Sequence, residues 1–110
     1  MKLTIIGPEG NRAEIEEMGD YYIGRSPGWG RVTSITGSDG ESQPIAEGHT
    51  SVSRDHLRVL ISDDGVVLGD RGSTMGSFLE DERFDTEHLT HSGQSKLRLG
   101  SVEFRLAYEM

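Results

Sequence analysis

Hydrophobic and polar residues alternate along much of the chain with a period of two, which is the pattern of half-buried β-strands. The clearest run covers residues 102–109, where Val, Phe, Leu and Tyr alternate with Glu, Arg, Ala and Glu. The two longest stretches without Gly or Pro, residues 49–64 and 77–92, show no apolar stripe with helical spacing. The pattern therefore predicts a protein built from strands.

Turn residues divide this pattern into many short strands. The predicted strands cover residues 3–6, 13–18, 21–25, 57–61, 66–68, 97–99 and 102–108. Asp64-Gly65 and Gly100-Ser101 separate neighbouring strands and are typical of tight hairpin turns. Short strands with turn signals about every 8–12 residues indicate an all-β sandwich or barrel.

Two segments interrupt the alternation. Residues 26–48 are rich in Gly, Ser, Thr and Pro, and they predict a long loop that is either functional or a mobile insertion. Only four apolar residues could anchor this loop: Trp29, Val32, Ile35 and Ile45. Residues 77–92 carry five acidic side chains between positions 80 and 87, which predicts a solvated surface turn.

Length and charge limit the possible functions. The chain has 110 residues, which fits one domain over residues 1–110, and a formal net charge of −8 from 19 acidic and 11 basic residues. Such a charge opposes binding to nucleic acid and to anionic membranes. There is no cysteine, and no apolar run is long enough for a signal peptide or a membrane span. We therefore expect a soluble, cytoplasmic protein.

Three short motifs at strand ends carry the candidate chemistry: Gly24-Arg25, Ser53-Arg54-Asp55-His56, and residues 72–77 (Gly-Ser-Thr-Met-Gly-Ser). Guanidinium groups pair with phosphate oxygens in a planar fork, and hydroxyl groups each donate one hydrogen bond. A local cluster of Arg25, Arg54 and Arg71 would attract one phosphate while the acidic body rejects long polyanions. The motifs thus favour a site for a tetrahedral dianion.

Two other kinds of site have weaker support. Ser53, His56 and Asp70 could be combined into a hydrolase triad, but the chain has no Gly-x-Ser-x-Gly nucleophile elbow. His88 and His91 have a spacing that could place two imidazoles on a metal, without a second strong ligand pair. We expect no catalytic residues, no metal and no cofactor.

The order of the motifs resembles the forkhead-associated (FHA) domain, a β-sandwich of two antiparallel sheets that recognises phosphothreonine in partner proteins. The matching segments are Ile-Gly-Arg-Ser at 23–26, Val-Ser-Arg-Asp-His at 52–56, Asp-Arg-Gly-Ser-Thr at 70–74, and Leu-Arg-Leu-Gly at 97–100 followed by Phe-Arg-Leu at 104–106. The resemblance extends over essentially the whole chain and implies about ten to eleven short strands.

The resemblance also implies roles for individual residues. Ser53 matches the serine whose hydroxyl donates to the phosphate, and Arg25 matches the arginine that reaches the phosphate or the adjacent peptide backbone. Arg54 occupies a second phosphate-contacting position, and Thr74 matches a threonine of the second recognition loop. Three residues match positions that support the site: Gly24, His56 and Gly76.

Met75 departs from the family pattern, because the family normally has Asn at this position. The Asn amide clamps the backbone of the bound peptide, whereas Met has no donor and only a weak thioether acceptor. Loss of such a hydrogen bond costs about 1–3 kcal/mol. The resemblance therefore implies that Met75 weakens the grip on the peptide.

The sequence thus predicts a phosphothreonine-dependent protein-binding module for signalling, whose partner is a Thr-phosphorylated protein or peptide. The alternative is a phosphate-independent interaction or oligomerisation module that presents Met75 and Trp29 as apolar contacts. Self-association through the 26–48 loop is a further hypothesis, because Thr36 has an acidic residue three positions on. Phosphorylated Thr36 of one copy would then bind another copy.

Overall fold

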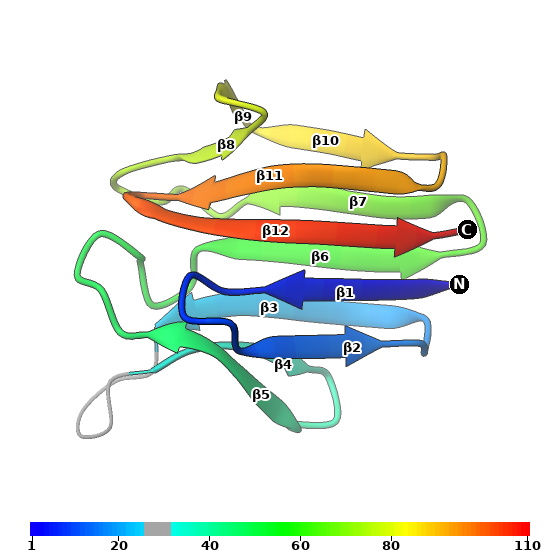
Figure 1. The fold of residues 1–110 in the computed structure, drawn as a ribbon, viewed down its shortest axis with the longest axis horizontal. Helices are drawn as coiled ribbons and strands as arrows, with labels where there is room; N and C mark the ends of the chain where they lie inside the picture. The colour runs from blue at the N-terminus through cyan, green and yellow to red at the C-terminus, as the bar shows by residue number, and fades with distance from the viewer. Residues whose placement is uncertain (26–31) are drawn as a thin grey trace.

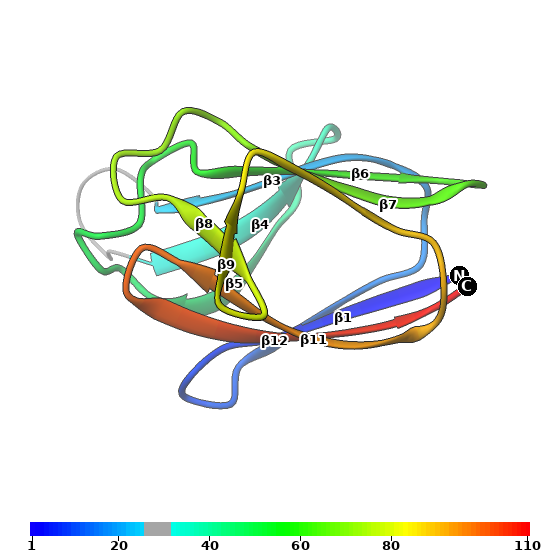
Figure 2. The ribbon, with the colours of Figure 1, turned by 90° about the horizontal axis from the view of Figure 1, so that it is seen from above.

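Two antiparallel sheets of six strands pack face to face in the computed structural model, which describes residues 1–25 and 32–110 (Figures 1 and 2). The first sheet has the order β2 (Arg12–Ile15), β1 (Lys2–Ile6), β12 (Val102–Glu109), β11 (Gly93–Leu99), β8 (Ser77–Leu79) and β9 (Glu82–Phe84). The second has the order β10 (Thr86–Leu89), β7 (Gly65–Asp70), β6 (Leu57–Ser62), β3 (Gly19–Arg25), β4 (Val32–Gly37) and β5 (Ser42–Glu47). No helix in these ranges could cross a membrane.

This architecture confirms the predicted all-β sandwich of two antiparallel sheets. The described residues form twelve strands, one more than the upper number expected. The period-two pattern correctly placed the strands that contribute several inward side chains, such as β6 and β12, where buried and exposed positions alternate. β2 is shorter than predicted, because the pairing of β2 with β1 ends at Ile15.

The prediction of a loop over residues 26–48 is wrong for most of that segment. β4 and β5 pair with each other around a turn at Asp39-Gly40, and Ile35 and Ile45 are buried in the core. A register shift after Thr33 allows two consecutive β5 residues, 45 and 46, to be buried. Two adjacent buried residues between polar ones do not alternate with a period of two, so the sequence pattern did not indicate this strand. Trp29 lies outside the described residues.

The prediction of a surface turn over residues 77–92 is also wrong. The segment forms β8, β9 and β10, each of which buries one side chain, namely Ser77, Phe84 and Leu89. The acidic side chains occupy the exposed positions and the turn between β8 and β9. At this turn Glu80 and Asp81 have positive φ values of 49° and 68°. Strands of three or four residues are too short to show a clear alternation.

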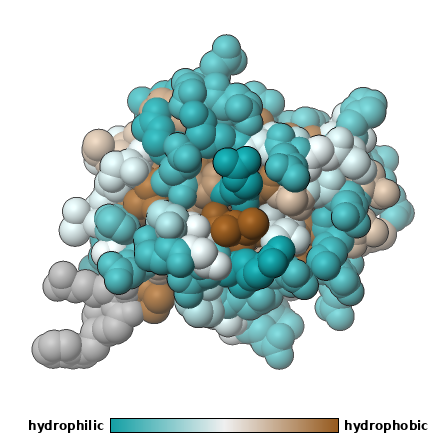
Figure 3. Space-filling view, in the orientation of Figure 1, coloured by the Kyte–Doolittle hydropathy of each residue, from teal (hydrophilic) through white to brown (hydrophobic). Residues whose placement is uncertain are grey.

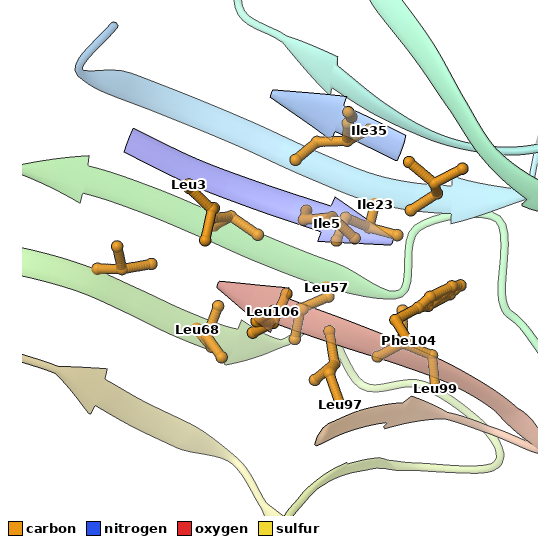
Figure 4. Packing of buried hydrophobic residues seen from close by; sticks show 14 of the residues in the cluster. Leu3, Ile5, Ile23, Ile35, Leu57, Leu68, Leu97, Leu99, Phe104 and Leu106 are labelled. Carbon is orange, nitrogen blue, oxygen red and sulfur yellow. The ribbon is translucent and has the colours of Figure 1, made fainter. Parts of the chain in front are cut away.

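Side chains from both sheets fill the space between them (Figure 4). The largest fully buried residues are Leu3, Ile5, Ile23, Ile35, Ile45, Leu57, Ile61, Leu68, Leu97, Leu99, Phe104 and Leu106. Burying a side chain of this size contributes about 1.5–3 kcal/mol. The outer surface that faces the viewer, over β1 and β12, is largely hydrophilic with a few separate hydrophobic areas (Figure 3). This packing fixes the strand ends on which the candidate site is built.

The two ends of the sandwich differ. The chain termini lie side by side at one end, where Lys2 pairs with Glu109 (Figure 2). The other end gathers three connecting segments: residues 48–56, 71–76 and 100–101. Hydrogen bonds link these segments, since the Gly100 amide donates to the Gly76 carbonyl at 3.0 Å and the Ser51 and Ser101 hydroxyls lie 2.7 Å apart. The predicted site residues lie at this second end.

Candidate functional site

A shallow hollow of about 560 Å³ lies at the end of the sandwich opposite the termini. Its lining residues are Arg25, Thr50, Ser51, Ser53, Arg54, Thr74 and Met75. The structure therefore brings together all five residues that the sequence proposed for binding, from three separate segments. Thr50 and Ser51 were missed, because hydroxyl residues in a loop give no signal of their own.

Arg25 is held in place from the end of β3. Its backbone N–H donates to the Ser53 carbonyl at 3.1 Å, and its Nε donates to the Val52 carbonyl at 3.1 Å. Within residues 1–25 and 32–110, its two terminal nitrogens have no hydrogen-bond partner and no carboxylate partner. One edge of the guanidinium is thus anchored, and no described residue pairs with the other edge.

Arg54 and Ser53 add further donors. Arg54 is exposed and forms no ion pair with the described part of the chain. The Ser53 hydroxyl accepts a long hydrogen bond of 3.4 Å from the Thr74 N–H, so its own proton can be donated to a ligand. This contact also holds the loop of residues 71–76 against Ser53.

His56 is a buried support for this arrangement. The Ser53 N–H donates to Nδ1 at 2.9 Å, so Nδ1 carries no proton and Nε2 donates to the Gly76 carbonyl at 2.9 Å. Burial lowers the pKa of His56 below its ordinary value of 6.5, and the Gly76 carbonyl and Asp70 only partly oppose this effect. Both ring nitrogens are therefore occupied by neutral hydrogen bonds.

The same bonds argue against the hydrolase alternative. The imidazole contacts the backbone N–H of Ser53, not its hydroxyl, and Asp70 is 3.9 Å from Nε2. A triad needs the base on the nucleophile's hydroxyl and the carboxylate on the opposite ring nitrogen. In this structure His56 joins the two loops that form the hollow.

Asp70 organises the second of these loops, a role that the sequence analysis did not assign. One carboxylate oxygen accepts from the Gly72 and Ser73 N–H groups at 3.1 and 3.0 Å, and the other accepts from the Ser73 and Ser77 hydroxyls, both at 2.6 Å. Burial alone would raise the pKa of Asp70, but these hydrogen bonds outweigh it and lower the pKa below 3.8. The Asp-x-Gly-Ser sequence was the available signal, since Asp often accepts from the backbone two residues on.

Replacing Asp70 with Asn is expected to lower the free energy of unfolding by about 2 kcal/mol at pH 7, because the amide nitrogen would face donors that now meet an oxygen. Urea denaturation followed by circular dichroism measures this effect. The deficit should shrink as the pH falls below 3.8, where the wild-type carboxylate also takes up a proton and loses its contribution. Asp64→Asn, on the exposed β6–β7 turn, is the control, and equal stability of the two variants would contradict the role of Asp70.

Two glycines shape the backbone around the hollow. A Cβ on Gly24 would lie 1.8 Å from the Arg54 carbonyl oxygen, so the close approach of β3 to this loop needs glycine. Gly76 has a φ of +92° and is covered by Arg83, whose Cζ would be 3.0 Å from a Cβ at this position. At both positions a side chain would disturb the backbone or a neighbouring residue beside the hollow.

Arg71 does not join the other two arginines. Its guanidinium pairs with Asp55 at 3.2 Å and lies over the ring of Tyr22, 5.2 Å from the centroid. It does not line the hollow. The predicted cluster of Arg25, Arg54 and Arg71 is therefore reduced to two members, since the folded chain brings the Asp55 carboxylate and the Tyr22 ring to the third.

This hollow differs in the charge of its lining residues from a second hollow near the β4–β5 turn. The second hollow, of about 600 Å³, includes five carboxylate residues in its lining: Glu14, Glu16, Glu17, Asp39 and Glu41. The described lining of the hollow at the opposite end has two arginines and no acidic residue, in a chain with a net charge of −8. Of these two hollows, it is the one that suits an anionic ligand.

The histidine pair does not form a ligand set in the described residues, which contain no group of three or more His, Asp or Glu side chains able to hold a metal ion. His88 is on the edge strand β10, and His91 contacts the Thr90 hydroxyl at 3.0 Å.

Thr36, the residue of the self-association hypothesis, lies within β4 with its hydroxyl 2.7 Å from that of Ser42. Thr36 is therefore part of a strand that pairs with its neighbours and not part of a loop.

Comparisons with known proteins agree with one another. The sequence model described as the FHA domain matches residues 21–100. The FHA domain of the CT664 protein from Chlamydia trachomatis is 20% identical, with a TM-score of 0.69 over 99% of this chain and 97% of that one. A solved structure from a study of phosphothreonine-dependent FHA domain interactions is 20% identical, with a TM-score of 0.73 over 100% of this chain and 99% of that one.

The N-terminal FHA domain of S. cerevisiae Rad53p, solved in complex with a phosphothreonine peptide, is 13% identical, with a TM-score of 0.67 over 99% of this chain and 94% of that one. No curated protein sequence matches the chain significantly. At these identities the solved structures show a shared fold, and the sequence match supplies the family.

Proposed function

Because this chain belongs to the forkhead-associated domain family, whose members are binding modules, we propose that it binds threonine-phosphorylated partner proteins through the hollow at the end of the sandwich. The observation that carries the proposal is the pair of guanidinium groups, Arg25 and Arg54, that line this hollow beside the Ser53 hydroxyl, with no acidic residue among the described residues of the lining. Phosphothreonine binding by the family, and the peptide complex of the Rad53p domain, support it.

The residues divide the work of holding the phosphate. Arg25 and Arg54 supply charge and paired N–H donors, which form shorter and stronger bonds to phosphate than neutral donors do. Ser53 donates its hydroxyl proton, and Thr74 offers a second hydroxyl from the opposite loop. His56, Gly24 and Gly76 hold the two loops at the distance that this grip requires. The chain is proposed to bind without catalysing a reaction.

Met75 is proposed to limit the affinity. It lines the hollow, but its thioether cannot pair with the backbone of a bound peptide as the family's Asn amide does. We expect dissociation constants in the micromolar range or weaker.

A cytoplasmic location remains a prediction of the sequence.

Titration of a degenerate phosphothreonine peptide library is expected to show binding that Arg25→Ala reduces by about 10- to 100-fold, the value of a charge-assisted hydrogen bond. Ser53→Ala should reduce it by about tenfold, the value of a hydroxyl donor to a charged acceptor. Fluorescence anisotropy measures both. Arg105→Ala is the matched control, because Arg105 is an exposed arginine on β12 outside the lining of the hollow.

The same titration contains the result that would overturn the proposal. Unphosphorylated peptides should not bind, and failure of every library member to bind would contradict phosphothreonine recognition. Equal losses in Arg25→Ala and Arg105→Ala would show that only the overall charge matters.

A second candidate function is a phosphate-independent interaction module on the same fold. The exposure of Met75, at 53%, favours it, because this side chain presents an apolar contact at the end of the sandwich. Partners that remain bound after phosphatase treatment, and that Met75→Ala releases while Arg25→Ala does not, would distinguish this function from the first.

A further inference from the structure

Met75 is the only apolar residue in the hollow's described lining. The other lining side chains are hydroxyls and guanidinium groups: Arg25, Thr50, Ser51, Ser53, Arg54 and Thr74. The Met75 side chain is 53% exposed, so its methylene groups and sulfur are available to a ligand. A ligand in this hollow therefore meets a polar wall and one apolar position.

The apolar position is next to the phosphate donors. Met75 directly follows Thr74, whose N–H lies 3.4 Å from the Ser53 hydroxyl oxygen. A phosphate held by Ser53, Arg25 and Arg54 would therefore place an adjacent residue of the peptide against Met75. That residue would lose water at the contact and gain no donor and only a weak acceptor from the thioether.

The chemistry of the peptide backbone then decides which residue fits. An ordinary residue brings an N–H that would find only this weak acceptor, whereas proline has no N–H and adds an apolar ring. Methionine is flexible and adapts its shape to such a ring. We infer that Met75 makes the site selective for phosphothreonine flanked by an apolar residue, with proline preferred. The inference rests on the proposed function.

The test uses the full chain and synthetic phosphothreonine peptides that differ only at the residue before or after the phosphothreonine. Proline, alanine and serine are compared at each of the two positions by isothermal titration calorimetry. We expect the wild-type chain to bind the proline peptide of one series about fivefold more tightly than its serine counterpart, the lower value for an unpaired buried N–H.

Variants assign the preference to one side chain. Met75→Asn, which offers an amide donor and acceptor, should reduce the proline preference to less than twofold, and Met75→Leu should retain it. Met18→Asn is the matched control, because Met18 is 57% exposed and precedes β3 at the end of the sandwich away from the hollow. It should leave the preference unchanged.

The outcomes separate this inference from the proposed function. Phosphothreonine peptides that bind equally well with proline, alanine and serine overturn the inference and leave the proposed function intact. A proline preference that persists in Met75→Asn also overturns it. Binding of no phosphopeptide, or equal binding of phosphorylated and unphosphorylated peptides, overturns both.

Discussion

Replacing Gly24 with alanine is expected to lower the free energy of unfolding by about 3 kcal/mol or more, the upper range for forcing atoms into a packed site. The added Cβ would lie 1.8 Å from the carbonyl oxygen of Arg54 and 2.7 Å from its carbonyl carbon. These are backbone atoms, so no side-chain rotation relieves the overlap. The loop of residues 53–55 must move away from β3, which also displaces Ser53 and Arg54, two of the residues proposed to bind the phosphate.

Urea denaturation monitored by circular dichroism measures this loss. Gly69→Ala is the matched control, because a Cβ at Gly69 in β7 would approach only the Arg58 Cβ, at 4.0 Å. The control should stay within about 0.5 kcal/mol of the wild type. If Gly24→Ala were as stable as Gly69→Ala, the close approach of β3 to the Arg54 carbonyl would be contradicted.

Replacing His56 with alanine is expected to lower the free energy of unfolding by about 3–5 kcal/mol at pH 7. The change leaves a cavity where the ring is now fully buried, and it leaves the Ser53 N–H without an acceptor. The Gly76 carbonyl keeps only its bond from the Gly100 amide. The two loops of the hollow lose their common support, so phosphopeptide binding should weaken with stability.

The pH dependence distinguishes His56 from an ordinary core residue. Because burial lowers its pKa below 6.5, the unfolded chain takes up the proton first, so the contribution of His56 is complete above pH 6.5 and decreases as the pH falls below it. The difference in stability between the wild type and His56→Ala should therefore narrow between pH 7 and pH 5. A constant difference over this range would contradict a neutral His56 in the folded state.

The sequence predicted the strands in which inward and outward side chains alternate over several residues. In β12, four inward side chains alternate with outward ones, so both the strand and its buried face could be identified. β8, β9 and β10 each bury only one side chain, and a single buried position cannot reveal an alternation with a period of two. The turn at Glu80 and Asp81 adopts positive φ without Gly or Asn, so it lacked the usual signal.

The candidate site could be predicted as far as the motifs extend. The order of Arg25, Ser53 and Thr74 along the chain was sufficient to expect them on neighbouring loops, and they line one hollow. The contacts of Arg71 could not be predicted, because they depend on the positions of Asp55 and Tyr22 in the folded sheet. Local motifs specify which residues are present, whereas the contacts made in the folded protein decide which of them line the hollow.

The position of the termini has a practical consequence. Both ends of the described chain leave the sandwich side by side, at the end away from the hollow. A linker, a fluorophore or a solid support attached at either terminus would therefore leave the hollow facing solution. Surface-immobilised and fluorescently tagged forms of this protein should accordingly be suitable for measuring the proposed phosphopeptide binding without redesign of the loops.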